Sequence, residues 1–267
     1  MSKVFKKIVR VLVEKEDKRV IIILEISTCT RKKMFKMNKV PMKLKIIQKG
    51  LELFLEKGFT NTTATEIAKS LNISKGNLTF HFPTKEDLLL ELIEELCTFQ
   101  ANLINHYVEE GERSLFAYCM ELAAMAWVCE TYPKAKDIYL ASYRHDKTLK
   151  LIREYDTNKL ERIFQQYNPN WKYNDFKNAE YLISGLEYAM LCSSNDETFP
   201  IETRITNTLK LIMETLNVDK EEIEIKLNRV LNTDCKSLGE NVLKEFIEYV
   251  DKVNLEAINN EILNRKK

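Results

Sequence analysis

The sequence predicts an all-α protein, and three observations lead to this expectation. Gly and Pro are scarce, at six and five of the 267 residues, and the Lys, Glu, Leu and Ile content suits helices joined by short loops. Apolar residues recur with the 3.6-residue period of a helix. Pro stands at or near the start of several of these periodic segments, where it is best tolerated in a helix. A chain of this length can bury one full core and a small additional module.

Charge is distributed unevenly along the chain. Residues 31 to 85 carry twelve Lys or Arg and three acidic residues, a formal charge of +9. Residues 86 to 267 carry 22 basic and 33 acidic residues, a formal charge of −11. The basic segment therefore suggests a polyanionic partner, whereas the average of the whole chain, +1, conceals it.

The basic segment begins with one helix and one short helix. A 3.6-period apolar stripe runs from Lys43 to Lys57 and ends at Gly58, the residue type that best adopts the left-handed conformation after a helix. Thr63 then stands three residues before Glu66, which is the spacing of a capping box. We therefore expect a second, short helix from Ala64 to about Leu71.

A third helix and the start of a fourth follow directly. Ser74 can cap a helix that extends to about Phe80, and Pro83 stops it. Thr84 and Asp87 form a second capping pair, which opens the next helix. Two short helices joined by a turn behind a longer supporting helix predict a helix-turn-helix, whose second helix enters the major groove of DNA.

The residues of this segment carry a family resemblance. The stretch "IIQKGLELFLEKGFTNTTATEIAKSLNISKG" is followed, without a gap, by Leu78, His81, Phe82, Lys85, Asp87 and Leu88. Residues 43 to 90 thus resemble the N-terminal DNA-binding domain of TetR-family transcriptional regulators. One departure is that Thr79 stands where the family often has a Tyr that touches phosphate.

The resemblance implies a domain organisation and a mechanism. Residues 41–88 would form the helix-turn-helix domain and residues 89–267 a helical effector-binding and dimerisation domain. A homodimer would present two recognition helices to a near-palindromic operator in double-stranded DNA. An unknown small-molecule effector would then favour the state with lower DNA affinity, so that a ligand-released repressor is expected.

Roles in DNA binding follow from the residue types. Thr62 and Thr63 would offer hydroxyl and N–H groups to a phosphate, and Lys75 and Asn77 would reach base edges. Gly76 costs helix propensity, so we expect its backbone to approach either DNA or the preceding helix closely. The complete set of expected DNA-binding residues is Thr62, Thr63, Ser74, Lys75, Gly76, Asn77, Thr79, Phe80, His81 and Lys85.

The rest of the chain is expected to form successive helices. The expected helices span residues 84–107, 112–131, 133–142, 146–167, 171–193 and 200–216, with one or two more between 219 and 264. Ten of the eleven Tyr and both Trp lie between Tyr107 and Tyr188. They indicate either ordinary core packing or a cavity for a small hydrophobic compound. The expected cavity residues are Phe116, Tyr118, Met120, Trp127, Tyr139, Tyr143 and Tyr188.

The first 40 residues do not fit the resemblance. Two β-branched runs, residues 9–13 and 20–26, give a weak hairpin signal. Two interpretations stay open: translation begins at Met34, Met37 or Met42, or the segment is a basic arm that follows the DNA backbone.

Other classes of protein are less compatible with the sequence. The six Cys and three His show no metal-ligand spacing, so neither a metal nor another cofactor is expected, and the Cys are expected to be reduced. No nucleophile elbow or phosphate-binding Gly-rich loop indicates an enzyme. No apolar run is long enough to span a membrane, which favours a cytoplasmic protein. One alternative function remains, a dimeric helical adaptor whose helix-turn-helix binds protein partners instead of DNA.

Overall fold

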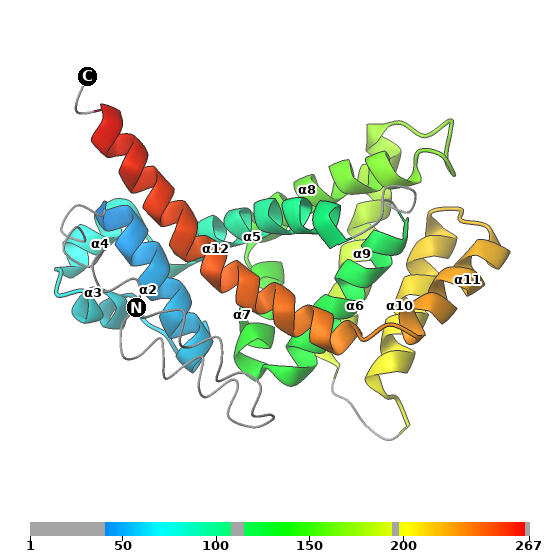
Figure 1. Cartoon of the computed structure of the whole chain (residues 1–267), viewed down its shortest axis with the longest axis horizontal. Helices are drawn as coiled ribbons and strands as arrows, with labels where there is room; N and C mark the ends of the chain where they lie inside the picture. Colours follow the sequence, from blue (N-terminus) through cyan, green and yellow to red (C-terminus); the bar gives the residue numbers. More distant parts are fainter. Residues whose placement is uncertain (1–40, 108–114, 194–197, 265–267) are drawn as a thin grey trace.

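The computed structural model describes residues 41–107, 115–193 and 198–264, with side chains described for residues 41–100, 115–193 and 198–251. The residues described are helical with no strand, which confirms the all-α prediction. Figure 1 shows α2 to α4 at one end of the molecule and α9 to α11 at the other. Two long helices, α5 and α12, run between these ends. The hairpin expected in the first 40 residues lies outside the described residues.

The helices at the first end begin and end close to where the sequence predicts. They are α2 (Met42–Lys57), α3 (Ala64–Ser70) and α4 (Lys75–His81). Gly58 ends α2 with a φ of 91°, and its N–H donates to the carbonyl of Phe54. Asn72 adopts a φ of 54° in the turn between α3 and α4. Local caps and turn residues thus set each boundary.

The remaining helices also match the expected segments, with ends that differ by a few residues. They are α5 (Lys85–Tyr107), α6 (Leu115–Thr131), α7 (Pro133–Arg144), α8 (Asp146–Phe164), α9 (Tyr173–Cys192), α10 (Ile201–Thr215), α11 (Lys220–Leu231) and α12 (Cys235–Asn264). Two helices, α11 and α12, occupy the last segment. None of the described helices has the length and apolar character required to cross a membrane.

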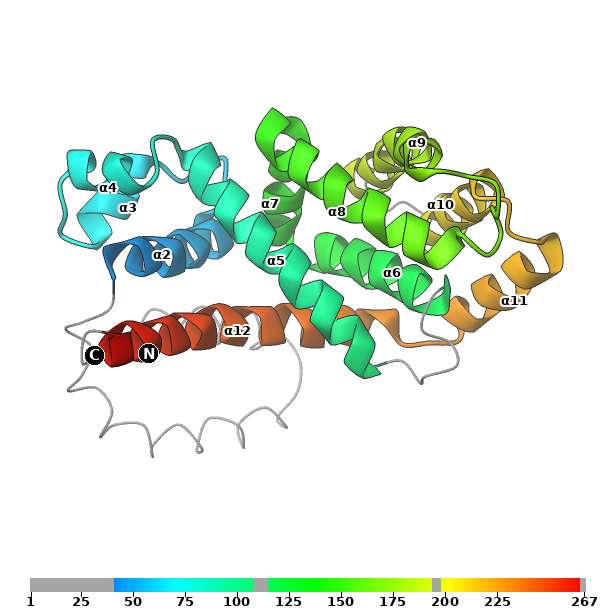
Figure 2. The same ribbon diagram turned by 90° about the horizontal axis from the view of Figure 1, so that it is seen from above.

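The long helix α12 packs against α6, α5 and α2. Figure 2 shows it running along the molecule and past α2. It approaches α6 closely at Gly239, where a Cβ atom would lie 2.6 Å from the carbonyl oxygen of Ala124 and 2.9 Å from Cγ2 of Val128. Only glycine permits this approach, so α12 is held against α6 at a defined position.

Two hydrophobic cores fill the described part of the chain. One lies among α6 and α8 to α11. The other is centred on α2 to α5 and also contains Ala141 of α7, Ile152 of α8, and Phe246 and Val250 of α12. The expected domain boundary at residue 88 falls within α5. The helix-turn-helix is therefore packed directly on helices from the second half of the chain.

Candidate nucleic-acid interface

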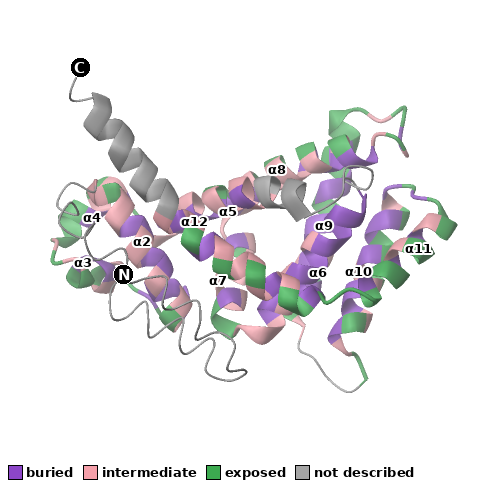
Figure 3. Cartoon of the chain, in the orientation of Figure 1, coloured by how far each residue is buried: buried purple, intermediate pink, exposed green. Residues whose placement is uncertain are grey.

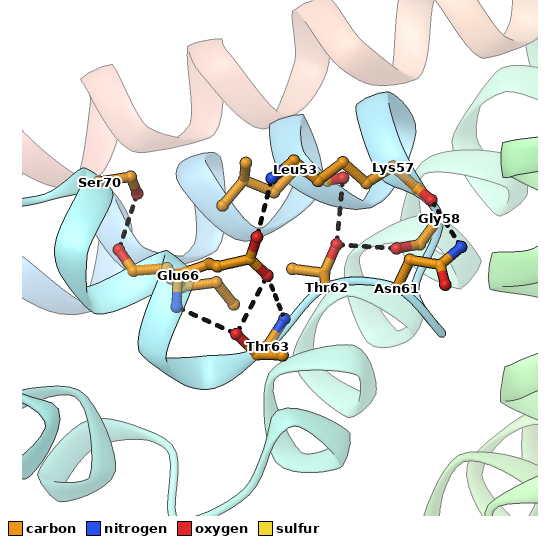
Figure 4. Close-up of polar contacts among 9 residues, drawn as sticks. Leu53, Lys57, Gly58, Asn61, Thr62, Thr63, Glu66 and Ser70 are labelled. Carbon is orange, nitrogen blue, oxygen red and sulfur yellow. Dashed lines mark hydrogen bonds and ion pairs between the residues drawn. The ribbon is translucent and has the colours of Figure 1, made fainter.

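The N-terminus of α3 is organised by the predicted capping box. The Thr63 hydroxyl accepts a hydrogen bond from the Glu66 N–H at 3.2 Å, and the Glu66 carboxylate accepts one from the Thr63 N–H at 2.9 Å. Glu66 also pairs with Lys57 at 2.8 Å, as Figure 4 shows. The bonds from Lys57 and Thr63 lower the pKa of Glu66 to about 2. Thr63 is exposed at the end of the helix.

Thr62 does not have the role expected for it. Its side chain points inward and the residue is 1% exposed. Its hydroxyl is within hydrogen-bonding distance of the Gly58 carbonyl at 2.7 Å and the Leu53 carbonyl at 3.3 Å (Figure 4). Its N–H donates to the Phe59 carbonyl. Thr62 therefore closes the turn after α2 and has no group left for a phosphate.

The outward face of α4 carries most of the expected DNA-binding residues. Ser74 caps the helix by accepting a hydrogen bond from the Asn77 N–H at 3.1 Å. Ser74, Lys75, Gly76 and Asn77 are exposed, while Leu78 is buried in the core. Phe80 is 83% exposed, an unusual state for so large an apolar side chain. Figure 3 shows exposed residues gathered on α3 and α4.

Thr79 and His81, near the end of α4, are less exposed than residues 74 to 77. The hydroxyl of Thr79 donates to the Gly76 carbonyl at 3.2 Å, and Thr79 is half-buried. The ring of His81, also half-buried, meets Phe80 edge-on with ring centroids 5.2 Å apart. A Cβ atom on Gly76 would have only the Ser74 hydroxyl nearby, at 3.9 Å. The expected close approach of Gly76 to the preceding helix is thus wrong, and its approach to DNA stays a prediction.

Lys85 also differs from the expectation that its charge is directed to a phosphate. Its ammonium donates to the carbonyls of Phe59 at 2.7 Å and Thr62 at 2.9 Å. It also lies 4.1 Å from the centre of the Phe59 ring. Burial lowers the pKa of Lys85. This cation therefore fastens α5 to the turn between α2 and α3.

Contacts from α7 and α8 hold the helix-turn-helix, and the sequence analysis did not find them. Asp137 accepts hydrogen bonds from the Thr60 N–H at 2.8 Å and the Thr60 hydroxyl at 2.7 Å. His145 meets the Phe59 ring edge-on, and Lys147 pairs with the Asp87 carboxylate. Asp137 lies 77 residues from Thr60, so no local sequence signal could reveal this contact.

The structure contains a cavity of about 280 Å³ between α2, α5, α6, α7 and α12. Phe116, Met120 and Tyr139, three of the expected cavity residues, line it. Eight Leu, Ile and Val side chains of α2, α5 and α12 also line it. These residues were not predicted, because the expected cavity was based on the clustering of aromatic residues.

Four expected cavity residues lie elsewhere, which corrects the predicted set. Tyr118 is buried edge-on against Phe164. Trp127 lines a separate hollow of about 130 Å³. The hydroxyl of Tyr143 donates to Glu187 at 2.8 Å, and that of Tyr188 accepts a hydrogen bond from Arg144 at 3.0 Å. Among the described residues, five Cys are free thiols and no group of His, Cys, Asp and Glu could hold a metal ion.

Comparison with known proteins finds relatives of the first end of the molecule. Residues 46–92 match the family described as bacterial regulatory proteins, tetR family. The biofilm operon icaADBC HTH-type negative transcriptional regulator IcaR of Staphylococcus epidermidis is 37% identical over 68 residues, which cover 26% of this chain and 33% of that protein. The IcaR of Staphylococcus aureus strain Newman is 40% identical over 88 residues, covering 30% of this chain and 47% of the relative.

A further curated relative and a solved structure are also similar to this chain. The uncharacterized HTH-type transcriptional regulator YuxN of Bacillus subtilis is 35% identical over 80 residues, which cover 30% of this chain and 28% of YuxN. Each of these curated relatives is thus matched over less than half of its length. Among solved structures, Salmonella enterica GusR aligns with a TM-score of 0.45 and 19% identity, covering 68% of this chain and 99% of GusR.

Proposed function

We propose that this chain is a homodimeric repressor of the tetR family of bacterial regulatory proteins, whose family model matches residues 46–92, and that it binds operator DNA through α4 and is released by a small effector. The observation that carries the DNA-binding part is the outward face of α4. Four consecutive exposed residues, 74 to 77, form the start of this helix and the ring of Phe80 is exposed near its end, while Leu78 anchors the helix in the core.

Each part of this face suits a different feature of DNA. Lys75 can donate to guanine, and Asn77 can pair with adenine. Thr63, Ser74, Thr79 and His81 offer polar groups that suit phosphates, which position a protein on the duplex. Gly76 leaves space for the DNA backbone. Thr62 and Lys85 are absent from this proposed interface because their polar groups are bonded within the protein.

A binding experiment tests this interface. An operator is selected from random duplexes, and its affinity is measured by fluorescence anisotropy at a series of salt concentrations. For Lys75→Ala we expect weaker binding with a salt slope shallower by up to about two units, since each of the two subunits loses one cationic contact with DNA. Lys220→Ala, an exposed Lys at the start of α11, is the matched control and should retain the wild-type slope.

The alternative function predicts a different outcome. An adaptor that uses its helix-turn-helix for protein partners would select no duplex and would show no salt-dependent affinity. Equal slopes for Lys75→Ala and Lys220→Ala, with tight binding retained, would remove α4 from the interface.

The proposed dimer is supported by the outer face of α9 and α10. From Asn178 to Cys192, every exposed position of α9 is uncharged. Leu182 of α9 is 65% exposed and Leu211 of α10 is 48% exposed. A Cβ atom on Gly185 would meet nothing within 4 Å, so this face is open to close approach by another helix. Two such faces would form the four-helix interface that the family resemblance implies.

Light scattering combined with size exclusion tests the dimer. Leu182→Glu would place a charge in the apolar interface and should give monomers. Ile225→Glu is the matched control, since Ile225 is similarly exposed on α11 but has Glu221, Glu224 and Arg229 as exposed charged neighbours. A dimer that survives Leu182→Glu but not Ile225→Glu would move the interface to α11.

A further inference from the structure

The cavity described above has an apolar wall with few polar residues. Leu51 and Leu55 of α2 form one side, and Leu238, Val242 and Phe246 of α12 form another. Gln100, Glu121, Tyr139 and Thr233 are the polar residues of the wall. A concave apolar space with a small number of polar groups is the usual form of a site for a small molecule.

Glu121 is the charged residue among the described residues of this wall, and one of its two carboxylate oxygens has no hydrogen-bond partner among them. Oε1 accepts a hydrogen bond from the Lys159 ammonium at 2.9 Å. Oε2 is buried and has no hydrogen-bond partner among the described residues. A buried carboxylate oxygen without a donor is costly, so a donor is expected to complete it.

The charges around Glu121 favour a cationic donor. Lys159 pairs with Asp156 at 2.8 Å as well as with Glu121. Burial alone would lower the pKa of Lys159, but the carboxylates of Asp156 and Glu121 raise it well above its ordinary value. One ammonium thus serves two carboxylates, and the three side chains carry a formal charge of −1.

Neighbouring titratable groups that the structure describes do not donate a hydrogen bond to Glu121 Oε2. Burial and the nearby Asp156 raise the pKa of Glu180 to about 10 and that of Glu187 to about 8, which favours the protonated form of both carboxyl groups. Burial also raises the pKa of the Cys97 thiol to about 12, which keeps it neutral. Arg153 bonds to Ser184 and stacks on Tyr181. No described cation is left to bind Glu121 Oε2.

We propose that this cavity binds a small apolar molecule with one protonated amine, whose ammonium pairs with the Glu121 carboxylate while its apolar body fills the space between α2 and α12. This assignment rests on the proposed function, because it makes the amine the effector that releases DNA. The same wall residues give the occupant a route to the helix-turn-helix. Leu51 belongs to α2, and Phe246 packs on Phe99 at 5.5 Å between ring centroids in the core that supports α2 to α4.

An isosteric ligand series tests the chemistry of the site. The probes are 1-adamantanamine, 1-adamantanol and 1-adamantanecarboxylate, which share one compact apolar cage and differ in the head group. Calorimetry on the full chain should show that the amine binds at least about tenfold more tightly than the alcohol, because its hydrogen bond to a carboxylate is charge-assisted. The carboxylate should bind most weakly.

Variants of the chain then test whether the probes bind in this cavity and beside Glu121. Glu121→Gln removes the charge and leaves Lys159 paired with Asp156, so the amine should lose its advantage over the alcohol. Glu214→Gln, an exposed Glu of α10, should leave the preference unchanged. Val242→Phe fills the cavity from α12 and should weaken the amine and the alcohol together. Equal binding of amine and alcohol to the wild type, strongest binding of the carboxylate, or an amine preference that persists in Glu121→Gln would each overturn the proposal.

Operator binding separates this inference from the proposed function. The selected duplex is titrated first without a probe and then with saturating amine. Binding that the amine weakens supports both. Binding that the amine leaves unchanged keeps the DNA-binding function and overturns the effector assignment. A chain that binds the amine but selects no duplex overturns the proposed repressor, while the preference for the amine would still identify the ligand chemistry of the cavity.

Discussion

Gly239→Ala is expected to destabilise the protein, although the same change in most helices is stabilising. The added methyl would lie 2.6 Å from the Ala124 carbonyl oxygen and 2.9 Å from Val128 Cγ2, about 1 Å inside a normal contact. Because the first obstacle is backbone of a buried helix, α12 has to move away from α6. Such overpacking costs about 2–3 kcal/mol. The gain in helix propensity, about 1 kcal/mol, offsets part of it.

The net effect is a loss of about 1–2 kcal/mol, which lowers the Tm by about 2–8 °C for a chain of this size. Circular dichroism during thermal and urea unfolding measures it. Gly76→Ala is the matched control, since a Cβ atom there meets only the Ser74 hydroxyl at 3.9 Å, and its unfolding midpoint should equal or exceed that of the wild type. A midpoint for Gly239→Ala at or above that of the control would refute the close packing of α12 on α6.

Three further predictions concern the DNA interface and the buried carboxyl groups. Gly76→Ala, though stable, should weaken operator binding by at least about fivefold because the methyl would lie between α4 and DNA; unchanged anisotropy titrations would move Gly76 away from the interface. The ring of Phe80 should contact a thymine methyl, so deoxyuridine at one thymine of one half-site should cost wild type about fourfold in affinity, whereas Phe80→Ala should not distinguish the two duplexes. Glu180 has a pKa raised to about 10 by burial and by Asp156, so the folded state holds a proton that the unfolded state loses above about pH 4.5. Stability in urea should therefore fall as pH rises from 6 to 9, and Glu180→Gln should show a shallower decline; an identical pH dependence in the two proteins would contradict the buried, unpaired state of this carboxyl.

The first half of the described fold was predictable because its signals are local. Gly58, the Thr63 and Glu66 pair, Ser74, and the Thr84 and Asp87 pair each act within a few residues of the chain. In the structure each of them caps or ends the helix that its spacing indicates. Helix ends in the second half were less accurate, because fewer of those helices begin with a side-chain cap.

The candidate interface was predicted in type but not in every residue. Thr62 and Thr63 have the same side chain and adjacent positions, yet one is buried in the turn and the other is exposed at a helix end. Lys85 has the same charge as Lys75 but bonds to two backbone carbonyls. Such differences depend on where α2 and α5 pack around residues 59 to 62. A residue's type and local spacing carry no information about that packing.

The lining of the cavity was even harder to predict, because it is formed only by the tertiary structure. Its walls combine residues from α2 with residues about 190 positions later in α12, and aliphatic side chains dominate them. In sequence these residues look like any helical core stripe. The unpartnered oxygen of Glu121 is equally invisible, since it follows from the sharing of Lys159 between two carboxylates.

The contacts around the helix-turn-helix restrict how an effector could act. Asp137 and Lys147 bind the turn after α2 and the start of α5, while Phe246 and Val250 enter the core beneath them. A change at α7 alone, or at α12 alone, would displace α4, because the helix-turn-helix is fixed to both of these helices. In the proposed mechanism, a ligand between α2 and α12 would push on the side of the helix-turn-helix that faces the cavity. Release of DNA would then require no separate relay, only a displacement of α2 relative to α12.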